Sequence, residues 1–357
     1  MITSIRLVNF KNFADETLRV GPFTVIVGAN ASGKSNIRDA FRVLHGIGRG
    51  YTLAEVIGGK YGAGGRLEWE PIRGATTEIV RVGQSGFTLR VSFDRAAYSY
   101  SIDITPGPSR LSPFSSWGET HTSDSKQAIY DAFANMRFFD LAPSRMRQPA
   151  FPGQTVLGDS GENLPTVLHE IYADPERRKT LIQWTQELTP MDVQDFKFPV
   201  DPSGLVHLVL CEANGREVSA YAASDGTLRF LAILAALLGE SPKGLYFFEE
   251  LDTGIHPARL SLLLELIERQ TTKHNVQVVT TTHAPNLLTF INDSTFEHLS
   301  VVCRLEDSHD AIIRPVAELP NARELRASGR GLGELLTEGW METALAFTEG
   351  EDEEHDE

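Results

Sequence analysis

The fold is decided by the stretch FTVIVGANASGKS, which occupies residues 23–35. Its first part, Phe23–Val27, is an apolar run of the kind that a buried strand shows. The next eight residues, 28–35, fit the pattern G-x-x-x-x-G-K-[ST]. A strand, a loop of this pattern and a helix, in this order, predict a phosphate-binding loop. The apolar residues that recur at helical spacing after the loop are Ile37, Ala40, Phe41 and Leu44.

The chemistry of nucleotide binding needs these residue types at these positions. Glycines let backbone N–H groups curl around phosphate oxygens, and the N-terminus of the helix adds positive potential. We expect Lys34 to reach the β- and γ-phosphates and the Ser35 hydroxyl to bind Mg²⁺. The sequence therefore predicts a site for ATP and Mg²⁺. The residues expected to contact the nucleotide are Gly28, Asn30, Ala31, Ser32, Gly33, Lys34, Ser35 and Asn36.

Two adjacent carboxylates, Glu249 and Glu250, directly follow the apolar run Leu245–Phe248. A buried parallel strand delivers such residues to its carboxyl edge, where phosphate-loop enzymes hold the metal ion and the attacking water. We expect Glu249 to hold Mg²⁺ through water, and Glu250 to orient or deprotonate the nucleophilic water. Without the phosphate loop, the pair would be interpreted as solvated acids at the end of a strand.

His283 ends a further β-rich run, at residues 276–282. A lone histidine after a strand usually has a structural role. At the edge of a sheet, however, an imidazole can donate a hydrogen bond to the γ-phosphate and respond to its loss. We therefore predict that Glu250, His283 and Lys34 form the catalytic set.

The rest of the chain is typical of an α/β protein. Alternating patterns at residues 77–82 and Phe87–Phe93 predict antiparallel strands and a β-rich first lobe. From residue 200 onward, strand and helix patterns alternate, beginning with a strand at residues 204–210, which predicts a parallel core sheet. No heptad pattern persists, so no long coiled coil is expected. The expected segments are an N-terminal lobe (1–140), a helical insertion (141–200), a C-terminal lobe (201–340) and an acidic tail (341–357).

The composition excludes several classes of protein. With 41% hydrophobic and 23% charged residues, the 357-residue chain is too ordinary for a disordered or fibrous protein. Its net charge of −15 disfavours a chain-wide electrostatic grip on nucleic acid, although seven of the acids crowd the last nine residues. Cys211 and Cys303 form no CxxC pair, so neither a disulfide framework nor a thiolate zinc site is indicated. Because no apolar stretch has membrane-spanning length and no signal-peptide layout is present, we expect a cytoplasmic protein without a membrane partner.

Further motifs accompany the phosphate loop and the acidic pair. They are IRLVNFKNF at residues 5–13, Ser224-Asp225-Gly226-Thr227 at the start of an expected helix, Gly254-Ile255-His256-Pro257, and Thr282-His283. This combination resembles ABC-type ATPases of the SMC and RecF group. More narrowly, it resembles the stand-alone bacterial AAA-family ATPases of anti-phage defence systems, which are related to the ATPase part of overcoming-lysogenization-defect nucleases. The resemblance covers residues 1–45 and 200–340 and implies an ABC-type P-loop ATPase head with a short helical insertion.

In such families, ATP is sandwiched between two heads. The resemblance implies that one head supplies the phosphate loop while Ser224 and Gly226 of the other contact the γ-phosphate. A helix that begins at these residues offers free N–H groups to an anion. The family therefore implies a homodimer closed by ATP. Taken alone, Ser-Asp-Gly is only a favourable helix cap.

The sequence departs from the family pattern in three places. Glu249 stands where the wider family usually has Asp, and the extra methylene displaces the metal-binding carboxylate unless the strand shifts. The signature motif, here Ser224-Asp225-Gly226-Thr227, differs from the Leu-Ser-Gly-Gly motif of transporters. This difference argues against a transport ATPase. No glutamine loop is evident, and Gln148 is the best candidate for it. The nearby Arg145 and Arg147 would bind phosphate or a partner, or lie on the surface.

The leading hypothesis is an ATP-hydrolysing molecular switch that controls a separate effector, such as a nuclease in phage defence. The alternative is a RecF-like DNA-binding ATPase of repair or recombination. Acidic charge disfavours this alternative, and the longest basic cluster is Arg177-Arg178-Lys179. A nuclease in the same chain is disfavoured because too few residues follow His283 to form a cleavage domain.

Overall fold

A computed structural model describes residues 1–74, 78–94, 99–104, 113–114, 123–189, 191–239, 243–304 and 310–345. Its contacts divide the chain into two compact units. The first unit contains residues 1–136 and 277–357, and the second contains residues 137–276. The units are therefore not arranged consecutively along the chain, whereas the sequence patterns suggested consecutive segments.

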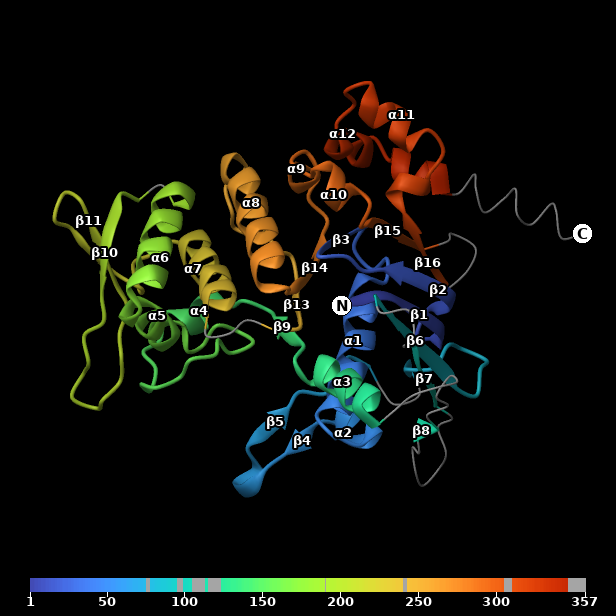
Figure 1. The fold of residues 1–357 in the computed structure, drawn as a ribbon, viewed down its shortest axis with the longest axis horizontal. Helices are drawn as coiled ribbons and strands as arrows, with labels where there is room; N and C mark the ends of the chain where they lie inside the picture. Colours follow the sequence, from blue (N-terminus) through green and yellow to red (C-terminus); the bar gives the residue numbers. More distant parts are fainter. Residues whose placement is uncertain are drawn as a thin grey trace, which may run out of the picture. The chain divides into compact units, whose positions relative to one another are not determined.

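The first unit joins the two ends of the chain, so it combines the blue and red elements of Figure 1. Its strands are β1 (Ile2–Phe10), β2 (Phe13–Arg19), β3 (Phe23–Val27), β4 (Lys60–Tyr61), β5 (Leu67–Trp69), β6 (Phe87–Phe93), β7 (Ser99–Ile104), β8 (Pro113–Phe114), β14 (Gln277–Thr282), β15 (Leu299–Arg304) and β16 (Ala311–Pro315). Its α-helices are α1 (Lys34–Gly48), α2 (Leu53–Gly58), α3 (Ser123–Ala134), α9 (Pro285–Leu288), α10 (Asp293–Phe296), α11 (Ala322–Ala327) and α12 (Leu332–Thr337).

An antiparallel sheet in the order β2-β1-β6-β7-β8 forms the β-rich part of this unit. Along β1, Ile5, Leu7 and Phe10 are fully buried, while Ser4 and Arg6 are not. Such alternation is what an antiparallel sheet with one covered face requires. The predicted β-rich first lobe is therefore present.

The core strands of the first unit run in the order β16-β15-β3-β14. Both neighbours of β3 are parallel to it, because Val27 pairs with Thr282 of β14 and with Val301 of β15. Every residue of β3 and β14 is buried, as expected for parallel strands that are covered on both faces. The carboxyl ends of these three strands consequently lie at one edge of the sheet.

Helix α1 packs against this unit through an apolar face that includes Ile37, Phe41 and Leu44. The helix also contributes a buried ion pair, since the Lys11 Nζ lies 2.5 Å from Asp39 Oδ2 and neither side chain is more than 8% exposed. Lys11 donates a second hydrogen bond to the carbonyl oxygen of Arg73, at 2.8 Å. The turn between β1 and β2 is thereby fastened to α1.

The second unit contains the middle of the chain, drawn from green to orange in Figure 1. Its strands are β9 (Arg137–Phe139), β10 (Val193–Lys197), β11 (Val209–Glu212), β12 (Glu217–Ser219) and β13 (Leu245–Phe248). Its helices are α4 (Pro143–Met146), α5 (Leu164–Ala173), α6 (Pro175–Leu188), α7 (Asp225–Leu238) and α8 (Pro257–His274).

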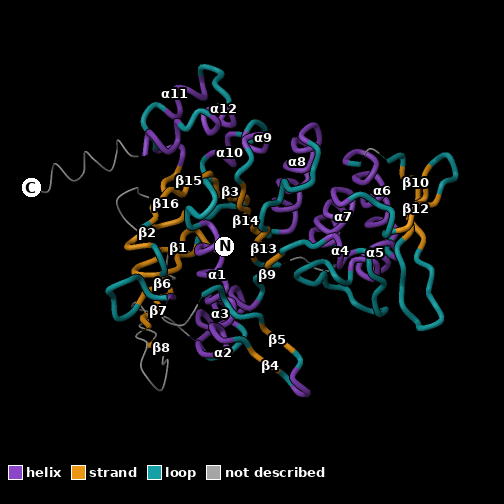
Figure 2. Tube along the Cα trace, turned by 180° about the vertical axis from the view of Figure 1, so that it is seen from behind, coloured by secondary structure: helices purple, strands orange, loops and turns teal. Residues whose placement is uncertain are grey.

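Helix α7 is the centre of the second unit. It is apolar on all sides and almost entirely buried, as a helix surrounded by other elements must be. Figure 2 shows α4, α5 and α6 gathered beside it, with β10 and β12 next to this group. Strand β13 pairs in parallel with β9, and the rings of Phe139 and Phe248 stack with centroids 4.7 Å apart.

One predicted strand of the parallel sheet is wrong. Residues 204–210 were expected to begin the alternating region, but the strand there is β11, which pairs antiparallel with β10 and β12. Asn214 and Gly215 form the turn between β11 and β12, with Gly215 at φ +82°. Because a tight turn can connect only antiparallel neighbours, this segment forms a hairpin outside the parallel sheet.

Two other expected segments differ from the structure. Within the described part of residues 77–82, only Val80 pairs with another strand, through an isolated bridge to Phe10. The acidic tail was expected to begin at residue 341, but residues 341–345 are helical, and Met341 and Leu345 are buried. Residues 346–357 lie outside the described residues.

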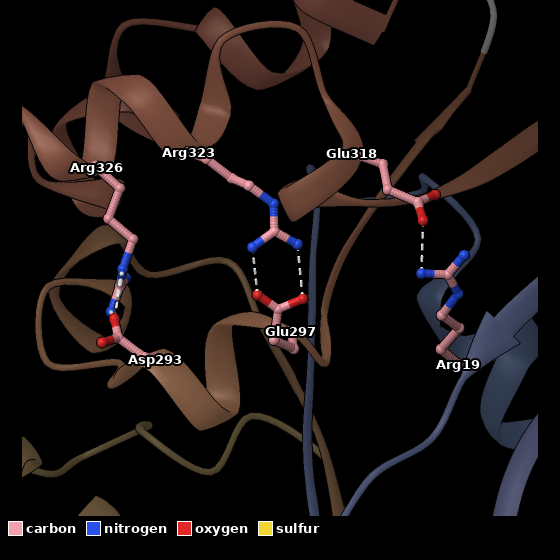
Figure 3. Close-up of polar contacts among 6 residues, drawn as sticks. All are labelled: Arg19, Asp293, Glu297, Glu318, Arg323 and Arg326. Atoms are coloured by element: carbon pink, nitrogen blue, oxygen red, sulfur yellow. Dashed lines mark hydrogen bonds and ion pairs between the residues drawn. The ribbon is translucent and has the colours of Figure 1, made fainter.

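Within the first unit, ion pairs on the surface connect segments near the end of the described chain to one another and to β2 (Figure 3). Arg323 binds both oxygens of Glu297, at 2.5 and 2.7 Å, and lowers the pKa of that carboxyl group. The other pairs drawn are Arg326 with Asp293 and Arg19 with Glu318. Because these groups are largely exposed, each pair contributes little free energy.

Among the described residues, no helix combines the length and the apolar character that crossing a membrane requires. The longest described helix, α8, has 18 residues. The expected absence of a long coiled coil therefore holds for the described part of the chain.

The contrast between buried and exposed pairs yields a stability prediction. Replacing Asp39 by Ala leaves the buried Lys11 ammonium without its carboxylate and should lower the free energy of unfolding by about 3–5 kcal/mol. Glu297→Ala removes an exposed pair and should cost less than about 1 kcal/mol. Urea unfolding of both variants measures the difference, and equal losses would contradict this account.

Candidate active site

The phosphate-binding loop lies between β3 and α1 and has an unusual backbone. Ala31 and Gly33 have φ values of +64° and +116°, so the chain turns sharply before the helix begins. A Cβ atom at Gly28 would lie 2.2 Å from the carbonyl oxygen of Val302 in β15. Glycine is therefore required at position 28 by packing as well as by any bound phosphate.

Polar groups of this loop are placed to bind an anion. The Lys34 Nζ donates hydrogen bonds to the carbonyl oxygens of Gly28 and Ala29, both at 2.6 Å, so the ammonium lies over the loop. The Ser32 side chain is 4% exposed, and its Oγ has no hydrogen-bond partner within the described residues. A buried hydroxyl without a partner is costly, and a phosphate oxygen would satisfy it. The loop therefore fits a nucleotide phosphate.

The remaining residues of the first unit that are predicted to contact the nucleotide belong to this loop or directly follow it. Asn30 and Ala31 are exposed, whereas Ser35 and Asn36 are half-buried at the start of α1. The Asn36 amide donates to Asn12 Oδ1, at 2.7 Å, which links the helix to the turn between β1 and β2.

A polar cavity of about 510 Å³ adjoins the loop at Ala31 and Asn36. Within its wall, Arg81 binds both carboxylate oxygens of Asp310, at 2.7 and 2.6 Å, and this contact raises the pKa of Arg81. Sequence reasoning missed these cavity residues, because they are far apart in the chain and follow no motif. The full lining is Lys11, Asn12, Ala31, Asn36, Arg81, Val82, Arg304 and Asp310.

His283 lies at the same edge of the sheet as the phosphate-binding loop. It directly follows Thr282, which pairs with Val27, the residue before Gly28. The Thr282 hydroxyl accepts a hydrogen bond from the N–H of Ala284, at 2.9 Å, and so shapes the exit from the strand. The His283 side chain is exposed. The structure therefore brings the predicted loop and the predicted histidine together.

The acidic pair belongs to the second unit, at the end of the fully buried strand β13. The Glu249 N–H donates to the carbonyl oxygen of Phe139, at 3.1 Å, and the Glu249 side chain is half-buried. Glu250 is exposed and has a φ of +47°, in the left-handed region that a side chain of its type rarely adopts. Such strain is often stored where a side chain must be presented for function.

Ser224 begins α7 in the same unit, and its hydroxyl accepts a hydrogen bond from the N–H of Thr227, at 3.1 Å. Arg147 holds this turn from outside, by donating to the Ala223 carbonyl oxygen at 2.9 Å and to Asp225 Oδ1 at 2.6 Å. This attachment to the turn at residues 223–225 was not among the roles considered for Arg147 from the sequence. Sequence reasoning missed this partner because the two segments are distant along the chain.

Gln148, the candidate for the glutamine loop, lies near this turn. Its Oε1 accepts a hydrogen bond from the hydroxyl of Tyr221, at 3.4 Å. Arg145 makes a weak contact with the hydroxyl of Ser160, also at 3.4 Å. The assignment of Gln148 to a glutamine loop stays a prediction.

Two further cavities lie within the second unit. One, of about 360 Å³, is lined by the signature residues Ser224 and Gly226 together with residues 254–256. The other, of about 550 Å³, lies along α5 and α6 and includes Tyr172 and Arg178. Burial and a hydrogen bond to Asp195 raise the pKa of Tyr172 to about 12, so this phenol is a donor and not a base at neutral pH.

The fold is that of the head domains of SMC proteins. Structures with this fold include an SMC head bound to the C-terminal winged-helix domain of ScpA, with 16% identity and a TM-score of 0.58, over 88% of this chain and 96% of that one. The SMC head of Pyrococcus furiosus, bound to the C-terminal domain of ScpA, has 14% identity and a TM-score of 0.55, over 92% and 99% of the two chains. The SMC head of Pyrococcus yayanosii has 9% identity and a TM-score of 0.54, over 92% and 99%.

The chain belongs to the AAA_21 family, described as "AAA domain, putative AbiEii toxin, Type IV TA system". The family model matches residues 23–141 and 212–289, which together are more than half of the chain. No curated protein has a matching sequence. The predicted recognition of an AAA-family, SMC-like ATPase is confirmed at this level, and so is the predicted fold class.

Members of a P-loop ATPase family bind ATP with Mg²⁺. The predicted metal residues lie in different units, with Ser35 in the first and Glu249 in the second. Within the described residues, no three His, Cys, Asp or Glu side chains gather as a metal cluster. A hydroxyl and a single carboxylate are the donor set that P-loop enzymes use for Mg²⁺, and the rest of its ligands are waters and phosphates.

The role of the lysine can be tested by direct binding. Lys34→Ala should abolish high-affinity binding of ATP, because it removes the ammonium that reaches the β- and γ-phosphates. Isothermal titration calorimetry with ATP and Mg²⁺ measures this, with Lys60→Ala as a control for loss of a surface lysine charge. Retained affinity in Lys34→Ala would overturn the assignment of the loop.

Proposed function

We propose that the protein is an ATP-hydrolysing molecular switch, in which ATP and Mg²⁺ close two copies of the chain head to head. The observation that carries the proposal is the phosphate-binding loop itself, with the Lys34 ammonium over it and the buried, unsatisfied Ser32 hydroxyl within it. Such a loop favours a triphosphate over an uncharged ligand, because its donors need anionic acceptors.

In this proposal, each of the predicted site residues has a separate role in ATP hydrolysis. Lys34 stabilises the charge of the terminal phosphates, and the Ser35 hydroxyl and Glu249 hold Mg²⁺, which supplies further charge stabilisation. Glu250 orients the attacking water and accepts its proton, and His283 donates a hydrogen bond to the γ-phosphate. The positive φ and the exposure of Glu250 support this role, because strained backbone conformations are often retained where a side chain is needed for function.

A second copy completes the proposed site. The N-terminus of α7 presents free N–H groups beside Ser224 and Gly226, and an opposing triphosphate would satisfy them. Closure would then depend on ATP, and loss of the γ-phosphate would reopen the dimer.

The switch is proposed to act on a separate effector, such as a nuclease, within a cytoplasmic anti-phage defence system. Support comes from the family description, which refers to a toxin of a toxin–antitoxin system. A DNA clamp receives less support from the structure. In the basic cluster at residues 177–179, Arg177 pairs with Asp174 and Arg178 pairs with Asp195, so only Lys179 has no ion pair among the described residues.

Turnover by a variant of the acidic pair tests the proposed chemistry. Glu250→Gln should keep ATP binding and slow hydrolysis by roughly 10²-fold or more, because the amide cannot accept the proton of water. Steady-state phosphate release measures this, and Glu265→Gln on the exposed face of α8 is the matched control. Near-normal turnover by Glu250→Gln would remove Glu250 from its role.

The dimer can be tested separately from the chemistry. In a Glu250→Gln background, ATP should convert monomers into dimers, as measured by analytical ultracentrifugation. Ser224→Arg should prevent this conversion by placing a long side chain at the start of α7, while ATP binding to the monomer persists. Dimers that form equally well with Ser224→Arg would contradict the proposed contact.

A further inference from the structure

We propose that Thr253 is a positioning residue for Glu250, and that the turn at residues 250–254 transmits the state of the signature turn to the Glu250 carboxylate. This inference rests on the proposed function of Glu250. It adds a residue outside the predicted site and a physical connection between two motifs that the sequence presents as separate.

The first observation is a hydrogen bond to the carboxylate itself. The Thr253 hydroxyl donates to Glu250 Oε2, at 3.2 Å, and the Thr253 N–H donates to the Glu250 carbonyl oxygen, at 2.9 Å. One residue thus holds both the side chain and the main chain of Glu250. A second turn follows at once, as the Ile255 N–H donates to the Asp252 carbonyl oxygen at 3.1 Å.

The turn has few alternative conformations. Glu250 and Gly254 both have positive φ, at +47° and +77°, and Leu251 between them is 4% exposed. A buried anchor and two left-handed residues within five positions leave little freedom for the backbone. The turn therefore fixes the position and direction of the Glu250 Cα–Cβ bond, and the hydrogen bond from Thr253 acts on the carboxylate itself.

The second observation joins this turn to the signature. A Cβ atom at Gly226 would lie 2.1 Å from the carbonyl oxygen of Gly254, so the two backbones touch. Both segments also line the cavity of about 360 Å³. Arg147 also holds the signature turn, through hydrogen bonds to Ala223 and Asp225. A displacement at Gly226 must therefore be taken up by the turn that carries Glu250.

This arrangement has a consequence for catalysis. When the signature turn of one head binds the opposing nucleotide, the contact between Gly226 and Gly254 holds residues 250–254 in place. The Thr253 hydroxyl then keeps one oxygen of Glu250 occupied, which restricts rotation of the carboxylate and aims it. Hydrolysis is thereby linked to dimer closure.

The decisive experiment is a double-mutant cycle on the full chain. Thr253→Val removes only the hydroxyl and should lower kcat roughly tenfold, with KM for ATP unchanged within twofold. Thr253→Ser keeps the hydroxyl and should restore kcat. In the Glu250→Gln background, Thr253→Val should have no further effect on kcat, and ATP-driven dimerisation should persist.

The outcomes separate this inference from the proposed function. Normal turnover by Glu250→Gln would overturn the role of Glu250 and, with it, that of Thr253. If Glu250→Gln is slow, three results overturn Thr253 alone: normal kcat in Thr253→Val, failure of Thr253→Ser to restore it, or an equal loss in both backgrounds.

A matched pair of glycine variants tests the connection to the signature. Gly254→Ala introduces strain at φ +77° beside Gly226, whereas Gly204→Ala introduces the same strain at φ +81°, with no atom within 4 Å. Gly254→Ala should lower kcat roughly tenfold and Gly204→Ala less than twofold. Equal effects, or a normal kcat in Gly254→Ala, would overturn the connection.

Discussion

The parallel pairing of β3 with β14 on one side and β15 on the other is the constraint on which the first unit depends. A strand buried on both faces can place charged groups only at its ends, since its interior has no water to solvate them. The phosphate-binding loop, His283 and Arg304 therefore emerge at one edge of the sheet. The charged groups gather there because the buried interiors of these strands contain only apolar and uncharged polar side chains.

Glycines at two of the motifs are needed by the protein's own packing. Gly28 lies against the carbonyl oxygen of Val302, and Gly226 lies against that of Gly254. At both positions a side chain would displace backbone before any ligand arrived. The motif residues are thus part of the scaffold as well as part of the proposed site.

Local features of the site were predictable from the sequence, and distant partners were not. The phosphate-binding loop, the end of β13 at Phe248 and the start of α7 at Ser224 follow from short patterns of apolar, glycine and capping residues. The pair of Arg81 with Asp310 and the attachment of Arg147 to Asp225 join segments whose proximity depends on the whole fold. The Asn214-Gly215 dipeptide is a local hairpin signal, and the prediction of a parallel sheet did not take it into account.

The first unit combines two segments that are distant in the sequence, and this affects when it can fold during synthesis. On a ribosome, β3 and its loop are synthesised early, but their neighbours β14 and β15 come from the last part of the sequence. Until those strands have been synthesised, both edges of β3 are unpaired, and Gly28 of its loop cannot pack against Val302. The nascent protein therefore cannot complete the packing of its phosphate-binding loop until the residues up to Val302 have been synthesised, and by then the second unit has already been translated.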